Sequence, residues 1–177
     1  MKKVYQLILS LFCFATVNAQ KTSITDTVKA VEKPTVPAYE RLKEVPPFNI
    51  LLVNDSTMFA KASLEKKKPT LIFVFSPSCE HCKKSTAEMV SKFDKFKGVN
   101  IVMATVAKYE PTKKFYDENN LKNYPNIKMG VDADYFLGRF YEVRTYPSIY
   151  LYDKKGLFKK FFNSSFTMGD IAKLIWY

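Results

Sequence analysis

The sequence predicts an α/β fold in which a central mixed β-sheet is flanked by helices on both faces. Short apolar runs alternate along the chain with segments whose apolar residues recur at helical spacing. Two β-prone runs joined by a four-residue turn then precede a last helical segment. Apolar runs without polar alternation are typical of strands buried on both faces, so we expect helices on each side of the sheet.

The N-terminus has the pattern of a secretory signal peptide over residues 1–19. Lys2 and Lys3 give it a basic start, residues 7–17 form a short apolar core, and small residues precede Gln20. The apolar core is short for a bilayer-spanning helix. A retained membrane anchor remains the alternative, and a cleaved signal predicts an exported, most simply periplasmic, protein.

A polar segment follows over residues 20–45, rich in Lys, Thr, Glu and Pro and almost without apolar periodicity. It is expected to be a flexible linker, with one helical turn near Tyr39–Lys43. Pro46 and Pro47 mark the start of a folded domain over residues 46–177. That length suffices for one well-packed domain.

The first half of the domain is expected to contain two strands, each followed by a helix. Residues 48–53 form an apolar run, and the turn residues after it predict a short helix over Met58–Lys66. Thr70–Phe75 is nearly all apolar and β-prone, as a buried strand should be. Apolar residues spaced by three and four then predict a helix over residues 83–96.

The second half is expected to add two more units of this kind and a closing hairpin. Residues 100–107 and 127–131 are predicted strands, and Pro111 is tolerated at the first turn of the helix between them. Asp134 is expected to cap a helix whose aromatic residues lie in the core: Tyr135, Phe136, Phe140 and Tyr141. A hairpin of strands 148–152 and 157–162 precedes a helix with a capping box at Thr167–Asp170.

The chain is basic, with a formal net charge of +11. Loss of the two signal-peptide lysines would leave +9. Lysine pairs and triplets recur along the domain, among them 66–68, 83–84, 154–155 and 159–160. These runs indicate a solvated surface or, alternatively, contact with an acidic partner or an anionic membrane. No nucleic-acid-binding motif is present, and nucleic acid is not an expected partner.

Two cysteines stand two residues apart in the segment Cys79-Glu80-His81-Cys82, between a predicted strand and a predicted helix. Unpaired N–H groups at a helix start stabilise a cysteine thiolate. Cys13 belongs to the expected signal peptide, and a disulfide closing so small a loop adds little stability. The pair therefore predicts thiol–disulfide exchange.

Other uses of these residues are less consistent with the spacing. A zinc site needs four ligands, and Cys79, His81 and Cys82 are too few and too crowded. A copper-delivery site would need a longer cysteine spacing, and a peroxidatic site would need a threonine ahead of its cysteine. With no glycine-rich phosphate loop either, no metal and no other cofactor is expected.

Two segments resemble the thioredoxin-fold family, and most closely its exported TlpA-like disulfide reductases. Residues 73–83, Phe-Val-Phe-Ser-Pro-Ser-Cys-Glu-His-Cys-Lys, are similar to the active-site segment of that family. Residues 143–156, which include Tyr146-Pro147, are similar to its cis-proline turn, strand and hairpin. The resemblance spans residues 46–177 and implies a thioredoxin-like three-layer fold. The extra helix and strand within residues 100–141 correspond to a TlpA-like insertion.

The resemblance also implies roles for the residues of both segments. Cys79 would attack a client disulfide, and Cys82 would resolve the mixed disulfide. Pro147, in a cis peptide bond, would present the Tyr146 backbone to the bound client chain. Two departures from the family pattern are Ser78, where an aromatic residue is usual, and Phe73, near the place of a buried acid.

Two residues between the cysteines are expected to tune the redox poise. A positively charged His81 would favour the Cys79 thiolate, and the negative charge of Glu80 would oppose it. The expected function is an exported thiol–disulfide oxidoreductase that acts on client proteins and receives electrons from a membrane thiol donor. A thioredoxin-like binding or scaffold module whose CxxC pair does not turn over is the alternative.

Overall fold

The computed structural model describes residues 36–177. The expected signal peptide and residues 20–35 of the expected linker lie outside this range. Within residues 36–177, no helix is long and apolar enough to cross a membrane.

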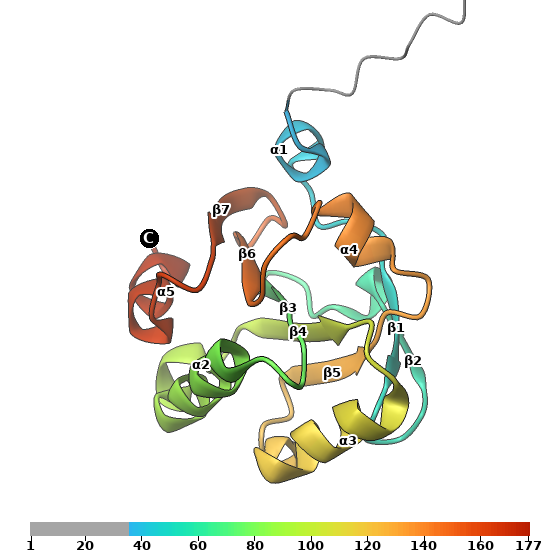
Figure 1. Cartoon of the computed structure of the whole chain (residues 1–177). Helices are drawn as coiled ribbons and strands as arrows, with labels where there is room; N and C mark the ends of the chain where they lie inside the picture. Colours follow the sequence, from blue (N-terminus) through green and yellow to red (C-terminus); the bar gives the residue numbers. More distant parts are fainter. Residues whose placement is uncertain (1–35) are drawn as a thin grey trace, which may run out of the picture. The chain divides into compact units, whose positions relative to one another are not determined.

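A seven-stranded mixed sheet forms the centre of the fold, in the order β2-β1-β5-β4-β3-β6-β7 (Figure 1). Its strands are β1 Asn49–Leu52, β2 Met58–Ala60, β3 Thr70–Val74, β4 Asn100–Thr105, β5 Ile127–Val131, β6 Ser148–Tyr152 and β7 Phe158–Phe162. The three central strands β3, β4 and β5 run parallel, and the outer strands pair antiparallel to their neighbours. The predicted mixed sheet is confirmed.

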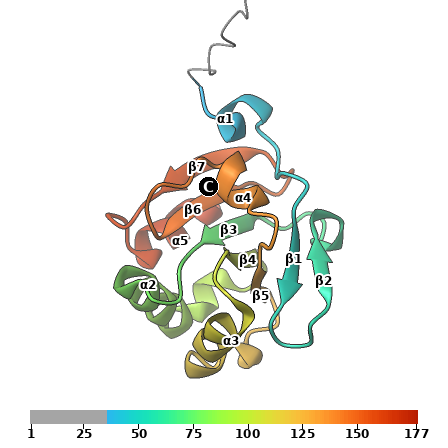
Figure 2. The ribbon, with the colours of Figure 1, turned by 45° about the vertical axis from the view of Figure 1, so that its right-hand side comes forward.

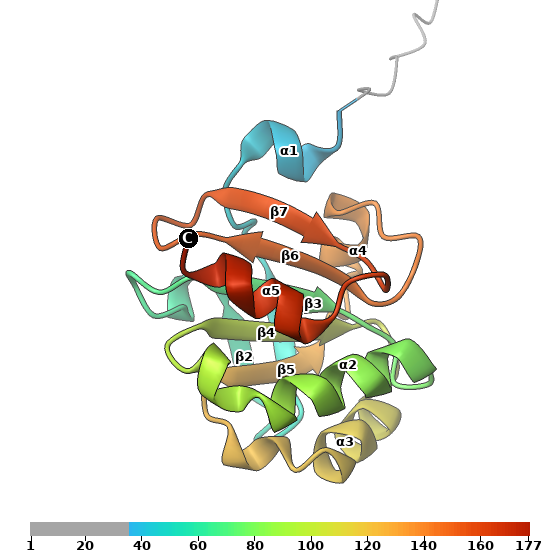
Figure 3. The same cartoon turned by 90° about the vertical axis from the view of Figure 1, so that its left-hand side faces the viewer.

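Helices cover both faces of the sheet. They are α1 Ala38–Leu42, α2 Glu80–Ser91, α3 Tyr109–Glu118, α4 Phe136–Phe140 and α5 Met168–Ile175. Figure 3 shows α2, α3 and α5 together in front of the sheet, on what we call the cysteine face. The other face, called the tyrosine face, packs against α1 and α4. This three-layer arrangement is the thioredoxin-like fold that the resemblance implied.

Strand β3 shows why its sequence is apolar throughout. Leu71 and Phe73 belong to the core on the cysteine face, whereas Ile72 and Val74 belong to the core on the tyrosine face. All of its residues are buried because side chains alternate between two covered faces. The absence of polar alternation in the sequence therefore has a structural cause.

The predicted helix over Met58–Lys66 is wrong. Residues Met58–Ala60 form strand β2, which pairs with β1 as an antiparallel hairpin at the edge of the sheet (Figure 2). A single 3₁₀ turn, Lys61–Ser63, follows it. Backbone pairing with β1 on one side holds this segment as a strand, and the helical preference of its side chains does not decide the outcome.

The predicted helix cap at Asp134 is also wrong. Asp132 caps α4 instead, because its carboxylate accepts hydrogen bonds from the backbone N–H groups of Phe136 (3.0 Å) and Leu137 (2.8 Å). Tyr135, expected in the core, is 40% exposed and has left-handed backbone geometry. Tyr141 is buried as predicted.

Residues 36–45, expected to belong to the linker, pack against the domain. Tyr39 of α1 is buried on the tyrosine face, with its ring centroid 5.1 Å from that of Tyr150. Val45 is buried as well, and Glu44 forms a β-bridge with Leu157. The packed part of the chain thus begins ahead of Pro46.

Candidate active site

The loop after β3 carries the first cysteine to the start of α2. Phe75 continues the pairing with β4 through a hydrogen bond from its N–H to the Ala104 carbonyl. A turn closes between the Cys79 N–H and the Ser76 carbonyl at 3.1 Å. Cys79 then has extended backbone geometry and occupies the N-cap position of α2, one residue before the helix begins. The helix starts at Glu80, three residues earlier than the apolar periodicity alone predicts.

The sulfur of Cys79 is itself the helix cap. The backbone N–H of Cys82 donates a hydrogen bond to Cys79 Sγ at a distance of 3.2 Å. This N–H is one of the unpaired donors of the first helical turn, and its partial positive charge stabilises negative charge on the sulfur. The sequence therefore places the Cys79 sulfur where the helix already supplies a hydrogen-bond donor.

The loop before β6 brings a second element to the same sulfur. Strand β6 runs antiparallel to β3, and Ser148 pairs with Val74, so the residues just before β6 meet the loop just after β3. The Tyr146–Pro147 peptide bond is cis. The Cys79 thiol lies 3.5 Å from the Tyr146 carbonyl oxygen and donates to it. The structure thus brings together the two segments that carry the family resemblance.

The two cysteines differ in exposure. Cys79 is partly exposed, Cys82 is fully buried, and neither is in a disulfide. Burial raises the pKa of the Cys82 thiol well above its ordinary value, and the neighbouring Cys79 thiol adds to the shift. Cys82 therefore remains a neutral thiol at neutral pH, while Cys79 is the sulfur that a second molecule can reach.

Glu80 and His81 are both exposed on the first turn of α2. The Glu80 carboxylate accepts a hydrogen bond from Lys83 Nζ at 2.7 Å, and this contact lowers the pKa of Glu80. Its negative charge is therefore partly offset by a cation beside it. Within residues 36–177, His81 has no hydrogen bond or ion pair.

The interior beneath the cysteines is apolar. Phe73 is fully buried in the core that includes Cys82. Thr86, one helical turn after Cys82, is also fully buried, and its hydroxyl has no hydrogen-bond partner among the described residues. No cluster of three or more potential metal ligands occurs within residues 36–177. Both hydrogen bonds of the Cys79 sulfur are to backbone groups, the Cys82 N–H and the Tyr146 carbonyl, so patterns of side chains in the sequence do not indicate them.

Comparison with known proteins agrees with this geometry. The sequence profile of the AhpC/TSA family matches residues 42–160, which is more than half of the chain. No curated protein sequence matches the chain.

Solved structures share the fold at low sequence identity. A secreted Mycobacterium tuberculosis disulfide oxidoreductase, described as homologous to Escherichia coli DsbE, is 22% identical with a TM-score of 0.61, covering 76% of this chain and 95% of that one. StoA from Bacillus subtilis is 18% identical with a TM-score of 0.58, covering 79% and 98%. Peroxidoxin BcpB from M. tuberculosis is 15% identical with a TM-score of 0.61, covering 73% and 90%. At such identities the likeness shows the fold.

Proposed function

Because the chain belongs to the AhpC/TSA family of thioredoxin-fold proteins, we propose that it is an exported thiol–disulfide oxidoreductase that reduces or exchanges disulfides in client proteins. The observation that carries the proposal is the position of Cys79. Its sulfur caps α2, lies beside the Tyr146 carbonyl and is partly exposed, with the buried Cys82 one turn behind it.

The reaction proceeds through a mixed disulfide. The Cys79 thiolate attacks one sulfur of the client disulfide, a new S–S bond forms, and the other client sulfur leaves as a thiolate. Cys82 then attacks Cys79 Sγ, which breaks the mixed disulfide and releases the second client sulfur. The Cys82 proton passes to a departing client sulfur, and two electrons in total have moved from the protein to the client.

The loop before β6 positions the client chain. The Tyr146 carbonyl faces the Cys79 sulfur, and Tyr146 itself is half-buried. A client segment in extended conformation could pair with this backbone as a short additional strand. Pro147 is buried, and the Ser148 hydroxyl donates to the Thr145 carbonyl at 2.8 Å, which holds the loop in place.

Charges around the start of α2 would set the reduction potential of the Cys79–Cys82 pair. A positively charged His81 favours the Cys79 thiolate, and a more stable reduced form makes the disulfide a stronger oxidant. Glu80 opposes this effect, although its pairing with Lys83 weakens the opposition. His81→Pro should therefore move the reduction potential toward more reducing values, as measured by equilibration with glutathione buffers.

The cellular setting of the proposal is extracytoplasmic. Residues 1–19 would direct export, and residues 20–35 would tether the domain in a periplasm. A membrane thiol donor would keep the cysteine pair reduced, since every turnover leaves the pair oxidised. N-terminal sequencing of the exported protein should begin near Gln20, and a chain that retains residues 1–19 would instead indicate a membrane anchor.

An insulin-reduction assay on the full chain tests the proposed activity. Turnover with dithiothreitol as donor is expected for the wild-type protein and not for the Cys79→Ser variant. A folded wild-type protein without turnover would favour a binding module whose cysteine pair is not catalytic. Consumption of hydrogen peroxide without insulin reduction would contradict the proposal and indicate a peroxidase.

A further inference from the structure

A cavity of about 770 Å³ lies at the end of β3 that is remote from the cysteines. Thr70, the first residue of β3, lines this cavity, whereas Cys79 follows the opposite end of the strand. The length of the strand, about 16 Å, separates the two regions. Neither cysteine lines the cavity, and it forms no part of the proposed redox site.

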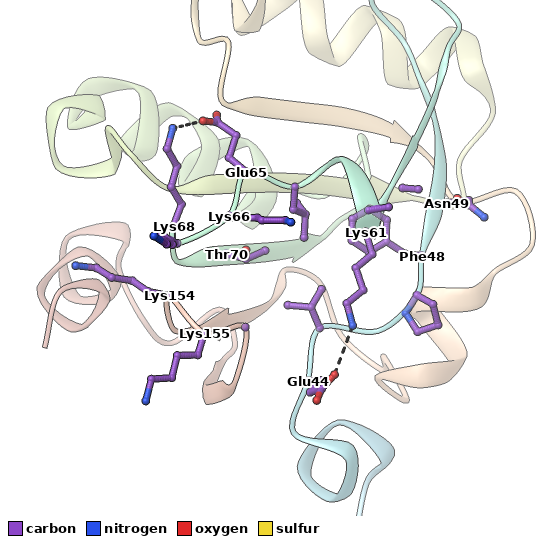
Figure 4. A pocket seen from close by; sticks show the side chains of 17 residues that line it. Glu44, Phe48, Asn49, Lys61, Glu65, Lys66, Lys68, Thr70, Lys154 and Lys155 are labelled. Atoms are coloured by element: carbon purple, nitrogen blue, oxygen red, sulfur yellow. Dashed lines mark ion pairs between the residues drawn. The ribbon is translucent and has the colours of Figure 1, made fainter.

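Four separate segments enclose the cavity: residues 44–49, 60–62, 64–68 and 154–156. The first leads into β1 and the next two connect β2 to β3. The last is the turn between β6 and β7. Figure 4 shows Phe48 on one side, Lys154 and Lys155 on the other, and Thr70 between them. The fold thus brings together two of the lysine runs in the sequence, 66–68 and 154–155.

The rim of the cavity is basic. Six lysines and two glutamates line it, which gives a formal charge of +4. Both glutamates are already paired, Glu44 with Lys61 at 3.7 Å and Glu65 with Lys68 at 2.5 Å (Figure 4). The remaining rim lysines, Lys66, Lys67, Lys154 and Lys155, have no ion pair within residues 36–177.

Lysines of the runs 83–84 and 159–160 already have local contacts. Lys83 pairs with Glu80, and Lys160 lies over the rings of Phe162 and Phe166. Lys159 donates to the Leu174 carbonyl. Lys154 at the cavity likewise lies over the Trp176 ring, with Nζ 5.4 Å from the ring centroid. The cavity differs from these runs because three of its lysines, Lys66, Lys67 and Lys155, line one recess without an ion pair among residues 36–177. Holding like charges together is unfavourable, and an anion between them would offset that repulsion.

The wall of the cavity is apolar below its basic rim. Pro47, Ala60 and Leu64 supply its accessible apolar surface, and Val45 and Phe48 are buried behind it. A volume of this size is within the range of pockets for small organic molecules, about 300–1,000 Å³. Apolar walls with charged groups at the opening favour a ligand that is itself apolar at one end and anionic at the other.

We propose that this cavity binds an amphipathic anion, a small molecule with a carboxylate or phosphate group and an apolar chain or ring. The anionic group would lie among Lys66, Lys67 and Lys155, and the apolar part would contact Pro47 and Leu64. A membrane surface fits less well, because the apolar residues line a recess that an intact bilayer does not enter. An acidic peptide fits less well because it would use the lysines and leave the apolar wall without a role.

Fluorescence titration of the full chain tests the proposal, with anilinonaphthalene sulfonate as an apolar anionic probe. One saturable site is expected, and monomeric dodecanoate and dodecyl phosphate should displace the probe. Dodecanol and dodecyltrimethylammonium, which lack the negative charge, should displace it at least about tenfold less effectively. Equal displacement by all four compounds would overturn the proposal, because the lysines would then have no role.

Charge-matched variants separate this site from general attraction to a basic protein. Lys66→Glu with Lys155→Glu should weaken dodecanoate binding at least about tenfold. Lys122→Glu with Lys160→Glu changes the net charge equally but lies outside the cavity, and should leave binding within about twofold of wild type. Equal weakening in both double variants would contradict a specific site.

A third variant tests the apolar wall, and two further ligands test the alternatives. Ala62→Trp places a large ring in the cavity while retaining every lysine, and should also abolish binding. Binding to anionic vesicles or to a polyglutamate peptide, without binding to monomeric dodecanoate, would overturn the proposal. Insulin reduction should be unchanged in all these variants, so the redox proposal and the anion site can fail independently.

Discussion

The cysteine face and the tyrosine face of the sheet hold their buried polar groups in different ways. On the tyrosine face, the hydroxyls of Tyr141 and Tyr152 hydrogen-bond at 2.7 Å, and the Tyr150 hydroxyl donates to the Tyr141 carbonyl at 3.4 Å. On the cysteine face, the Cys82 thiol lies in an apolar core, and the Thr86 hydroxyl has no partner among the described residues.

The difference suits a sheet whose tyrosine face is stabilised by hydrogen bonds and whose cysteine face carries the proposed redox site. Hydrogen bonds among the tyrosines offset the cost of removing their hydroxyls from water. The apolar surroundings of Cys82 instead raise the pKa of its thiol and keep it neutral, as the proposed reaction requires before a mixed disulfide forms. The Cys82 thiol has no strong hydrogen-bond partner and lies one helical turn behind the partly exposed sulfur of Cys79.

The largest expected effect is a loss of activity confined to the cysteine face. Cys79→Ser should lower the rate of insulin reduction at least about 100-fold, because a hydroxyl does not replace the thiolate nucleophile. Tyr152→Phe removes one hydroxyl from the tyrosine face and should retain most of the activity. The insulin-reduction rates of the two variants are measured side by side. A comparable loss in both would mean that activity depends on the tyrosine face as much as on the cysteine face.

Within the pair, limiting iodoacetamide should label Cys79 before Cys82. Cys79 is partly exposed, whereas burial and a raised pKa keep the Cys82 thiol protonated and inaccessible. Peptide mapping by mass spectrometry identifies the labelled residue. Preferential labelling of Cys82 would contradict the assignment of Cys79 as the attacking sulfur.

Alkaline pH should destabilise the reduced protein in two stages, one from each face. The folded-state pKa of Cys82 is raised, so its contribution is fully present below the unfolded-state value of about 8.5 and declines above it. Burial also raises the pKa of Tyr141, Tyr150 and Tyr152, whose contributions decline above about 10. Each group lowers the free energy of unfolding by about 1.4 kcal/mol per pH unit in its range.

Urea unfolding of the reduced protein between pH 7 and pH 11 measures both stages. The Cys82→Ala variant should show a shallower decline just above pH 8.5 and keep the steeper decline above pH 10. Identical pH profiles for the variant and the wild type would show that the buried thiol does not contribute.

Removal of the Asp132 cap tests how much α4, which covers the tyrosine face, contributes to stability. Asp132→Ala should lower the free energy of unfolding by about 1–2 kcal/mol, because the N–H groups of Phe136 and Leu137 lose their acceptor. Asp134→Ala is the matched control, since Asp134 is exposed, and its effect should stay within about 0.5 kcal/mol. A larger loss of stability in Asp134→Ala than in Asp132→Ala would support Asp134 as the cap, as predicted from the sequence.

The smallest expected effect comes from two buried threonines on the helices of the cysteine face. Thr86→Val removes a hydroxyl that has no partner and should leave stability unchanged or raise it by up to about 1 kcal/mol. Thr112→Val removes a hydroxyl that donates to the Lys108 carbonyl at 2.9 Å and should cost about 1 kcal/mol. Chemical denaturation compares the two, and destabilisation by Thr86→Val would reveal a role for its hydroxyl.

The sequence predicts the central sheet because its strands are set by local composition. The apolar runs that become β3, β4 and β5 need no knowledge of their partners to be recognised. Met58–Ala60 is different, because its strand forms only through pairing with β1. Short segments of this kind are decided by tertiary contacts that the pattern does not contain.

The same limit applies to individual side chains. Asp132 and Asp134 stand two residues apart, and the left-handed backbone of Tyr135, which decides between them, is not visible in the sequence. Tyr39 lies in a polar segment of the sequence, and its burial depends on packing against Tyr150, a residue more than one hundred positions away. The cysteine pair could be found from spacing alone, whereas the convergence of two distant lysine runs required the fold.

The hydrogen bond from the Cys82 N–H to Cys79 Sγ gives the protein a built-in spectroscopic reporter. A thiolate is a strong acceptor, whereas a sulfur within a disulfide is a weak one. The chemical shift and solvent-exchange rate of this single amide proton should therefore follow the state of the reactive sulfur. NMR of the ¹⁵N-labelled protein would then distinguish the reduced, client-bound and oxidised forms during turnover, without a dye or a mutation near the site.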